Sequence, residues 1–180
     1  MRRRRLGAAL VFAAATGLVA YLGARASPGR RNRGRRRWYG KLEKPPFQPP
    51  AWVFGPVWSL LYLLIAASGW QTYMAAPGKE RDRALALWGV QLAMNGLWTW
   101  LFFARRKPAL ALMDTALLFA AVAAYAREAR RVRPSASNLV LPYLAWVGFA
   151  TLLNAEIVRR NRGDASATRP SRLLPQPIHP

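Results

Sequence analysis

The chain has 180 residues, of which 53% are hydrophobic, yet its formal net charge is +21. It contains no cysteine, one histidine and seven acidic residues, which excludes disulfide bonds and thiolate metal sites and leaves little material for histidine or paired-carboxylate chemistry. We therefore expect neither a metal site nor a bound cofactor.

The basic residues are not spread along amphipathic elements, as they would be in a soluble basic domain. They occur in blocks between nearly uncharged apolar runs, which is the layout of a polytopic membrane protein embedded in the lipid bilayer. The sequence predicts an all-α membrane protein, a bundle of five transmembrane helices whose long first loop acts as a lid.

Residues 1–24 begin with four arginines, at positions 2–5, and continue into an apolar run of roughly 17 residues. This order resembles a cleavable signal peptide. The run is longer than the ~7–15 residues of a signal peptide's apolar region and approaches the ~17–25 residues that a helix needs to span a bilayer. We interpret residues 1–24 as a retained first transmembrane helix with a basic N-terminus, and a cleaved signal peptide is the alternative.

Residues 25–51 form the first connection, which is basic in its first half and rich in proline and aromatic residues, Trp38 among them, in its second. The basic half, ARASPGRRNRGRRR, has the composition of a nucleic-acid-binding segment. Beside a membrane span, such a block more often sets the topology or meets anionic lipid headgroups, so we expect no nucleic-acid partner. In the second half, four prolines exclude a helix interior, and we interpret this half as a lid over a pocket.

Residues 52–160 contain four further apolar runs, which we predict to be transmembrane helices 2–5. The predicted spans cover residues 52–73, 84–104, 108–126 and 138–158, and short charged segments separate them. Residues 161–180 contain four prolines and no apolar run long enough to bury, so we predict a disordered basic tail.

The numbers of lysines and arginines in the connections predict the orientation, because cytoplasmic loops carry the excess. The side with the first loop, the third loop and the C-terminal tail carries 17 of these residues, and the opposite side carries 11. We therefore expect the first loop and the C-terminus to be cytoplasmic, although the four N-terminal arginines argue for the reverse. The expected location is the bacterial inner membrane, or the outer mitochondrial membrane if the source is eukaryotic.

Helical spacing brings aromatic and polar side chains onto one face of three predicted spans. These faces consist of Trp58, Tyr62 and Ile65 in the second span, Gln91, Asn95, Trp98 and Phe102 in the third, and Tyr143, Trp146, Ala150 and Asn154 in the fifth. Aromatic walls with a few amide or hydroxyl groups suit a large, flat, mostly apolar ligand. The alternative is that the polar groups only bond helix to helix and the tryptophans form a belt at the membrane interface.

Two further features of the predicted spans have a functional and a structural interpretation. Asp114 lies about two turns into the fourth span, where a carboxylate is a candidate functional group; its alternative role is to pair with Arg105, Arg106 or a neighbouring polar group near the membrane edge. Gly89 and Ala93 form a small-xxx-small step in the third span, which allows two helices, or two copies of the chain, to approach closely.

Three blocks of the sequence resemble the TspO/MBR family, the tryptophan-rich sensory proteins and translocator proteins (peripheral benzodiazepine receptors). They are WYGKLEKPPFQPPAWVFGPVWSLLY, QLAMNGLWTWLFF with the later ALMD, and LPYLAWVGFATLLN, and with the five-span spacing they cover roughly residues 35–162. The resemblance implies a five-helix bundle, often dimeric, with a ligand pocket beneath the first loop. Members bind porphyrins, and some bind cholesterol and benzodiazepine-type ligands.

Carried over by motif, the resemblance implies a pocket formed by the first loop and the last four spans. The implied ligand-binding residues are Tyr39, Trp58, Tyr62, Asn95, Trp98, Phe102, Asp114, Trp146, Phe149 and Ala150. Two of the positions that depart from the family pattern bear on the shape of the pocket. Phe47 stands where tryptophan is common, and Gly96 replaces a bulky aromatic residue, which would enlarge the pocket locally.

The expected function is that of an integral membrane receptor or binding protein for tetrapyrroles, meaning porphyrins and intermediates of the haem pathway, and for similar flat hydrophobic molecules. A wider role in transport of these ligands or in stress signalling is implied by the resemblance. The alternative is a light- and oxygen-dependent porphyrin-degrading enzyme, in which Trp58 and Trp146 would be the catalytic residues. The expected assembly is a homodimer through the helix that contains Gly89.

Overall fold

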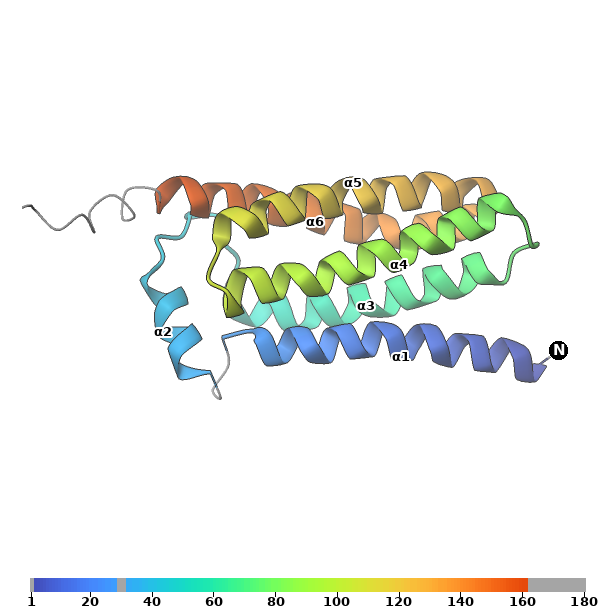
Figure 1. Cartoon of the computed structure of the whole chain (residues 1–180), viewed down its shortest axis with the longest axis horizontal. Helices are drawn as coiled ribbons and strands as arrows, with labels where there is room; N and C mark the ends of the chain where they lie inside the picture. Colours follow the sequence, from blue (N-terminus) through green and yellow to red (C-terminus); the bar gives the residue numbers. More distant parts are fainter. Residues whose placement is uncertain (1, 29–31, 162–180) are drawn as a thin grey trace, which may run out of the picture.

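The computed structural model describes residues 2–28 and 32–161 and is all-helical over this part of the chain. Its elements are α1 (Arg2–Ala26), α2 (Arg33–Lys41), α3 (Ala51–Tyr73), α4 (Lys79–Thr99), the π-helical segment η1 (Trp100–Ala104), α5 (Pro108–Val132) and α6 (Pro134–Arg160). No residue in these two ranges forms a β-strand. The five long helices run alongside one another, and the short α2 lies across one end of the bundle (Figure 1).

The long helices close into a ring. α5 packs against α4 and α6, α3 packs against α6 and α1, and α1 in turn contacts α4, so the order around the bundle is α1, α3, α6, α5, α4. Successive long helices alternate in direction (Figure 1). As a result, α2, the turn between η1 and α5, and the end of α6 share one end of the bundle.

Four helices, α1, α3, α5 and α6, are long and apolar enough to cross a membrane, which makes the chain a multi-pass integral membrane protein. α4 is not among them, because its first turn carries acidic residues, Glu80 and Asp82, and its apolar part continues beyond Thr99 into η1. The prediction of an all-α membrane protein is confirmed, whereas the count of five spans stays a prediction.

The helices extend beyond the apolar runs that predicted them. α5 reaches Val132, six residues past its predicted end, and α6 begins at Pro134, four residues before its predicted start. Long basic side chains at helix ends can carry their charge toward the headgroups while the backbone stays helical. The length of an apolar run is therefore shorter than the length of the helix that contains it. The tail predicted for residues 161–180 lies outside the described residues, apart from Asn161.

The first connection differs from the continuous loop that is predicted for residues 25–51, because residues 33–41 form α2. Arginine is a good helix former, and two aromatic side chains attach this helix to the bundle. The ring of Trp38 lies 5.8 Å from that of Phe102, and the ring of Tyr39 lies 5.5 Å from that of Phe103, both edge-on. This short helix cannot be predicted from the spacing of apolar residues, because most of its residues are arginine, lysine or glycine.

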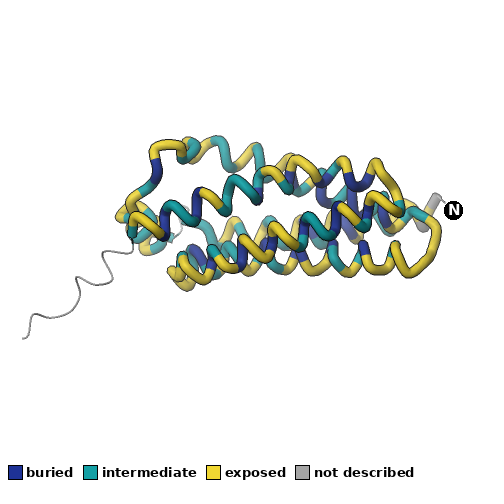
Figure 2. The backbone as a smooth tube through the Cα atoms, turned by 90° about the horizontal axis from the view of Figure 1, so that it is seen from above, coloured by how far each residue is buried: buried dark blue, intermediate teal, exposed yellow. Residues whose placement is uncertain are grey.

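The half of the bundle remote from α2 is closely packed. The fully buried side chains there include Ile65, Val122, Tyr125 and Val140. The Tyr125 hydroxyl shares hydrogen bonds with the hydroxyls of Ser68, at 2.6 Å, and Thr72, at 3.0 Å, which ties α3 to α5. Near α2 the packing is looser, because α2 has no buried residue and α3 has none before Leu61 (Figure 2).

Exposed residues alternate with buried ones along the long helices (Figure 2), and many of the exposed residues are large and apolar. The most exposed of them include Leu10, Leu63, Leu117 and Leu152. Lipid tails are as apolar as leucine, so these exposed side chains can contact lipid. Polar side chains such as Gln91 and Asn154 are buried inside the bundle.

Candidate ligand-binding site

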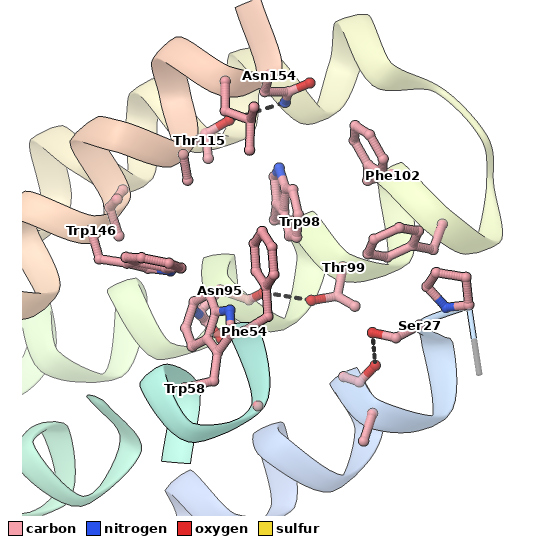
Figure 3. Close-up of a pocket in the computed structure, with 18 of the residues that line it drawn as sticks. Ser27, Phe54, Trp58, Asn95, Trp98, Thr99, Phe102, Thr115, Trp146 and Asn154 are labelled. Atoms are coloured by element: carbon pink, nitrogen blue, oxygen red, sulfur yellow. Dashed lines mark hydrogen bonds between the residues drawn. The ribbon is translucent and has the colours of Figure 1, made fainter. Parts of the chain in front are cut away.

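A cavity of about 640 Å³ lies in the half of the bundle next to α2, a volume within the ~300–1,000 Å³ of small-molecule sites. All six α-helices and η1 contribute to its wall. The larger side chains of the wall include Tyr39, Phe54, Trp58, Tyr62, Asn95, Trp98, Phe102, Phe103, Trp146 and Asn154 (Figure 3). Among the described residues, no lysine, arginine, aspartate or glutamate lines this cavity, so its interior is uncharged and mostly aromatic.

Aromatic rings from three helices form the two sides of the cavity (Figure 3). Phe54 lies one turn before Trp58 on α3 and packs edge-on against Trp146 of α6, with ring centroids 5.8 Å apart. On the other side, Trp98 of α4 stacks on Phe102 of η1 at 5.3 Å. The rings leave a slot between them. Phe54 is absent from the predicted site residues, although its spacing of four from Trp58 places both on one helix face.

Asn95 and Tyr62 line the cavity as predicted, but they are already bonded to one another. The Tyr62 hydroxyl donates to Asn95 Oδ1 at 2.8 Å, and Asn95 Nδ2 donates to the Tyr143 hydroxyl at 3.0 Å. This chain of hydrogen bonds joins α3, α4 and α6 beside the cavity. Both ends of the Asn95 carboxamide are therefore engaged within the protein.

Tyr39 is the predicted site residue that α2 contributes to the cavity wall. Its hydroxyl donates to Gln48 Oε1 at 3.4 Å, and the Lys44 ammonium lies 4.7 Å from the centre of its ring. Burial raises the pKa of the Tyr39 hydroxyl above its ordinary value of 10.0, and the hydrogen bond to Gln48 opposes this rise. The hydroxyl is neutral at physiological pH and closes the α2 end of the cavity without adding charge.

Two of the predicted site residues, Asp114 and Phe149, do not line the cavity. Phe149 lies behind the wall, where its ring packs 5.6 Å from that of Trp146. Asp114 is 5% exposed on α5 and forms no ion pair among the described residues. The interpretation of Asp114 as a partner of Arg105 or Arg106 is therefore wrong.

The two departures from the family pattern also lie away from the cavity. A side chain at Gly96 would point at α1, where the nearest atom is Val19 Cγ1 at 3.6 Å, so this glycine lets α1 approach α4 and does not enlarge the pocket as predicted. Phe47 is 51% exposed and packs edge-on against Phe149 at 6.4 Å. The remaining predicted residues, Tyr39, Trp58, Tyr62, Asn95, Trp98, Phe102, Trp146 and Ala150, all lie in the wall.

No metal-ligating or cofactor-binding residue is predicted, and Gly89 and Ala93 are the residues predicted to form a dimer contact. The described residues contain no group of three or more histidine, cysteine, aspartate or glutamate side chains that could hold a metal ion. Gly89 and Ala93 are exposed on the outer face of α4, and a Cβ at Gly89 would meet nothing within 4 Å. This strip is open to a neighbouring helix.

The end of the bundle around α2 is strongly basic. Seven exposed basic residues gather there: Arg33, Arg36, Arg37 and Lys41 on α2, and Arg105, Arg106 and Lys107 in the turn before α5. The two groups are adjacent, because Arg106 Nη2 lies 3.5 Å from the place that a Cβ would take on Gly34. None of the seven forms an ion pair with a described residue, so their positive potential is available to anionic groups.

The segment between α2 and α3 is attached to the end of α6 by one amide side chain. The Glu43 backbone N–H donates to Asn161 Oδ1 at 3.0 Å, and Asn161 Nδ2 donates to the Glu43 carbonyl oxygen at 3.0 Å. Asn161 thus joins the segment between α2 and α3 to the end of α6.

Known proteins match the chain over most of its length, and a model of the TspO/MBR family matches residues 7–160. The translocator protein of Homo sapiens is 41% identical over 132 residues, which are 71% of this chain and 76% of the relative. The translocator protein of Ovis aries is 39% identical over 138 residues, 74% of this chain and 80% of the relative. The tryptophan-rich sensory protein of Cereibacter sphaeroides is 36% identical over 152 residues, 84% of this chain and 90% of the relative. With matches of this extent to both animal and bacterial members, the chain belongs to the TspO/MBR family.

Proposed function

We propose that this chain is a membrane binding protein for tetrapyrroles such as porphyrins, and for similar flat hydrophobic molecules. The observation that carries the proposal is that three tryptophans, Trp58, Trp98 and Trp146, line one cavity of about 640 Å³ that has no charged residue in its wall among the described residues. A porphyrin presents a large, flat, apolar face, and stacking on aromatic rings favours that shape. The names of the relatives, translocator and sensory protein, support a wider role in transport or in stress signalling.

The charge distribution supports one orientation of a porphyrin in the cavity. Its propionates are anionic at neutral pH, and burying them in the uncharged wall is unfavourable. At the α2 end, Lys41 and the exposed arginines offer charge-assisted hydrogen bonds to these carboxylates. The ring would therefore lie between the tryptophans, with its propionates toward α2.

The lid and the five spans belong to the same proposal. Residues 25–51, which include α2, would be the lid, because Tyr39 lines the cavity from this segment. The spans would be residues 1–24 and four within residues 52–160, with α4 and η1 together forming the third. This count puts the two termini on opposite sides of the membrane, and the excess of basic residues favours a cytoplasmic lid and C-terminus. The proposed membrane is the bacterial inner membrane.

A homodimer through α4 is proposed for the assembled protein. Gly89 and Ala93 lie on the exposed face of this helix, and small residues at this spacing let helix backbones approach closely in a bilayer. The dimer would leave the cavity of each copy intact, because neither residue lines it.

Protoporphyrin IX titrated into the purified chain in lipid nanodiscs tests the binding proposal, with the Soret absorbance of the porphyrin as the signal. Replacing both stacking residues in a Trp58→Ala, Trp146→Ala double variant should weaken binding about 10- to 100-fold, because each aromatic pair contributes about 0.5–1.5 kcal/mol beyond the area that it buries. Trp52→Ala is the matched control, since this side chain is 76% exposed outside the cavity, and it should bind as the wild type does. Equal affinity of the double variant and the wild type would contradict the proposal.

A second candidate function is light- and oxygen-dependent degradation of the bound porphyrin. It is favoured by the position of Trp58 and Trp146, two oxidisable indoles in the wall of one cavity. Illumination of the same samples in air distinguishes the two functions. Bleaching that is faster than for free porphyrin and is lost in the double variant indicates the enzyme, whereas bleaching at the free rate leaves binding alone.

A further inference from the structure

The α2 end of the bundle carries a basic surface built from two segments that are distant in the sequence. The surface consists of exposed side chains of α2 and of the turn before α5: Arg33, Arg36, Arg37, Lys41, Arg105, Arg106 and Lys107. None of the seven forms an ion pair with a described residue. Charges of one sign that gather in this way repel one another, so an anion from outside the chain stabilises this end when it binds.

The acidic side chains on the surface of this end do not balance the charge. Glu156, near the end of α6, is already paired with Arg159 and Arg160, each at 2.7 Å. Glu43 is exposed between α2 and α3 and forms no ion pair with a described residue. The described part of the chain therefore leaves most of the positive charge of the basic surface without a counter-charge.

Arg106 of the basic surface has a backbone conformation that arginine rarely adopts. Its φ is 54°, and no other described residue adopts this left-handed conformation, which is strained for a residue with a Cβ. The Arg106 guanidinium lies against α2, where Nη2 is 3.5 Å from the place that a Cβ would take on Gly34. Arg37 follows Gly34 by three residues and so lies on the same face of α2. Strained residues cluster at functional sites, and an anion shared by Arg106 and α2 gives this conformation a function.

Two exposed tryptophans place the basic surface at the level of lipid headgroups. Trp52, in the first turn of α3, is 76% exposed, and Trp100, the first residue of η1, is 44% exposed. Both positions lie at the α2 end of the bundle (Figure 1), and the other six tryptophans of the chain are buried or half-buried. Tryptophan is enriched at membrane–water interfaces. The Arg105 guanidinium lies 4.8 Å from the centre of the Trp100 ring, so the basic surface contacts one of these interface residues.

We propose that the basic surface binds the headgroups of anionic phospholipids of the surrounding bilayer, with Arg106 and Arg37 as its central residues. A lipid phosphodiester accepts charge-assisted hydrogen bonds from guanidinium groups. The acyl chains of the same lipid can contact exposed apolar side chains beside the surface, such as Leu110 in the first turn of α5. A soluble phosphate has no such chains. The proposal goes beyond the tetrapyrrole function and does not rest on it, because no cavity tryptophan takes part.

The test measures the enrichment of phosphatidylglycerol around the purified full chain in vesicles of phosphatidylcholine and phosphatidylglycerol. Two preparations have the same composition, but a different one of the two lipids carries brominated acyl chains in each. Bromine quenches the tryptophans that it contacts, so the exposed Trp52 and Trp100 report the lipid beside the basic surface. Phosphatidylglycerol should be enriched about fivefold over its share of the bilayer, the factor that corresponds to ~1 kcal/mol. A wild type without enrichment overturns the proposal.

An Arg36→Gln, Arg37→Gln, Arg106→Gln triple variant should abolish this enrichment. The substitutions are on the surface and keep long polar side chains, so the bundle should stay folded. Salt of about 1 M, at which the Debye length is ~3 Å, should also reduce the enrichment. Enrichment that survives in the triple variant overturns the proposal.

The matched control removes the same charge from the opposite end of the bundle. Arg127, Arg130 and Arg133 are exposed there and form no ion pair with a described residue. An Arg127→Gln, Arg130→Gln, Arg133→Gln triple variant should keep the fivefold enrichment. Equal losses in the two triple variants would show that the net charge of the chain attracts the lipid, and would overturn a site at the α2 end.

Arg106→Gly separates binding from a structural role of this residue. Glycine adopts the left-handed conformation without strain, so the variant should unfold at a higher temperature than the wild type in phosphatidylcholine alone. Its phosphatidylglycerol enrichment should fall about twofold, because one guanidinium is lost. Unchanged enrichment would show that Arg106 does not contact the lipid and would contradict its central place in the site.

Inorganic phosphate identifies the source of the bound phosphate group. Added to the same vesicles at constant ionic strength, it should leave the quenching by brominated phosphatidylglycerol unchanged. Displacement of the lipid would indicate a site for free phosphate and would overturn the lipid as its occupant. All these samples are free of porphyrin, so neither result depends on whether the cavity binds tetrapyrroles.

Discussion

Asn95 and Asn154 show how one residue type takes two roles in the same cavity wall. The carboxamide of Asn95 is bonded at both ends, to Tyr62 and to Tyr143, and braces three helices. The carboxamide of Asn154 is bonded only through its nitrogen, which leaves its oxygen buried without a partner among the described residues. A polar side chain beside a pocket is therefore a candidate ligand contact only after its partners within the protein are counted.

Gly69 is the residue at which the packing of α1, α3 and α4 is tightest. A Cβ there would lie 2.5 Å from Trp88 Nε1 and 2.7 Å from Phe12 Cδ1, and Trp88 is held in place because Nε1 donates to the Ile65 carbonyl oxygen at 2.9 Å. Gly69→Ala should therefore lower the free energy of unfolding by about 1–3 kcal/mol, the usual cost of overpacking. Thermal unfolding in detergent, followed by circular dichroism, measures the change.

Gly17→Ala provides the control for this prediction. A Cβ at Gly17 would meet nothing within 4 Å, so only the helix propensity changes, which favours alanine by about 1 kcal/mol. The two variants should shift the unfolding temperature in opposite directions. Equal shifts for Gly69→Ala and Gly17→Ala would show that the close approach at Gly69 does not limit stability.

At the scale of elements, the nine residues of α2 provide both exposed basic side chains and aromatic contacts with η1. Arg33, Arg36 and Arg37 are exposed, and its last turns place Trp38 and Tyr39 against η1. The segment after it makes no regular structure before Ala51, so its position depends on individual bonds. The paired hydrogen bonds between Glu43 and Asn161 join it to the end of α6, and Phe47 packs against Phe149 of the same helix.

Removing these two hydrogen bonds should loosen residues 42–50, which belong to the proposed lid. In Asn161→Ala we expect faster amide hydrogen exchange over residues 42–50, because segments held by few bonds open locally at low free-energy cost. The dissociation of protoporphyrin should also become about 2- to 10-fold faster, in line with the net ~0.5–1.5 kcal/mol of a hydrogen bond. Asn138→Ala, on the exposed face of α6, should change neither. Unaltered exchange in Asn161→Ala would show that the bulk of the segment is held by its other contacts.

At the scale of the whole molecule, the ring of five long helices is closed tightly at one end and is hollow at the other. The tight end is held by the hydroxyl cluster of Ser68, Thr72 and Tyr125. At the hollow end, α2 lies across the bundle (Figure 1) and contributes Tyr39 to the cavity wall, and basic side chains are exposed there. The proposed topology therefore puts the cavity next to the cytoplasmic surface.

The absence of cysteine from the sequence makes this topology directly testable with single cysteines. Gly78→Cys, before α4, and Lys107→Cys, before α5, lie in exposed turns at the two ends of the α4–η1 segment. A membrane-impermeant maleimide applied to intact cells should label Gly78→Cys, whereas Lys107→Cys should react only after permeabilisation. Labelling of both from the same side would contradict a span through α4 and η1, and the reverse pattern would contradict the proposed orientation.

The sequence by itself determined the class of this protein and the direction of most side chains in the site. Apolar runs bounded by arginines predict membrane-spanning helices because the bilayer leaves no other way to satisfy backbone polar groups. Helical periodicity then puts Trp58 with Tyr62, and Trp98 with Asn95, on shared faces, and all four line the cavity.

Only the tertiary structure decided which faces meet. Periodicity orients side chains within a helix, but the rotation of that helix against its neighbours depends on contacts between residues far apart in the sequence. For this reason Asp114 and Phe149 lie outside the cavity and Gly96 faces α1. The amide oxygen of Asn95 accepts a hydrogen bond from Tyr62, whereas that of Asn154 has no partner among the described residues. The order α1, α3, α6, α5, α4 around the ring, which depends on packing at positions such as Gly69, brings Trp98 of one helix and Trp146 of another to the same cavity.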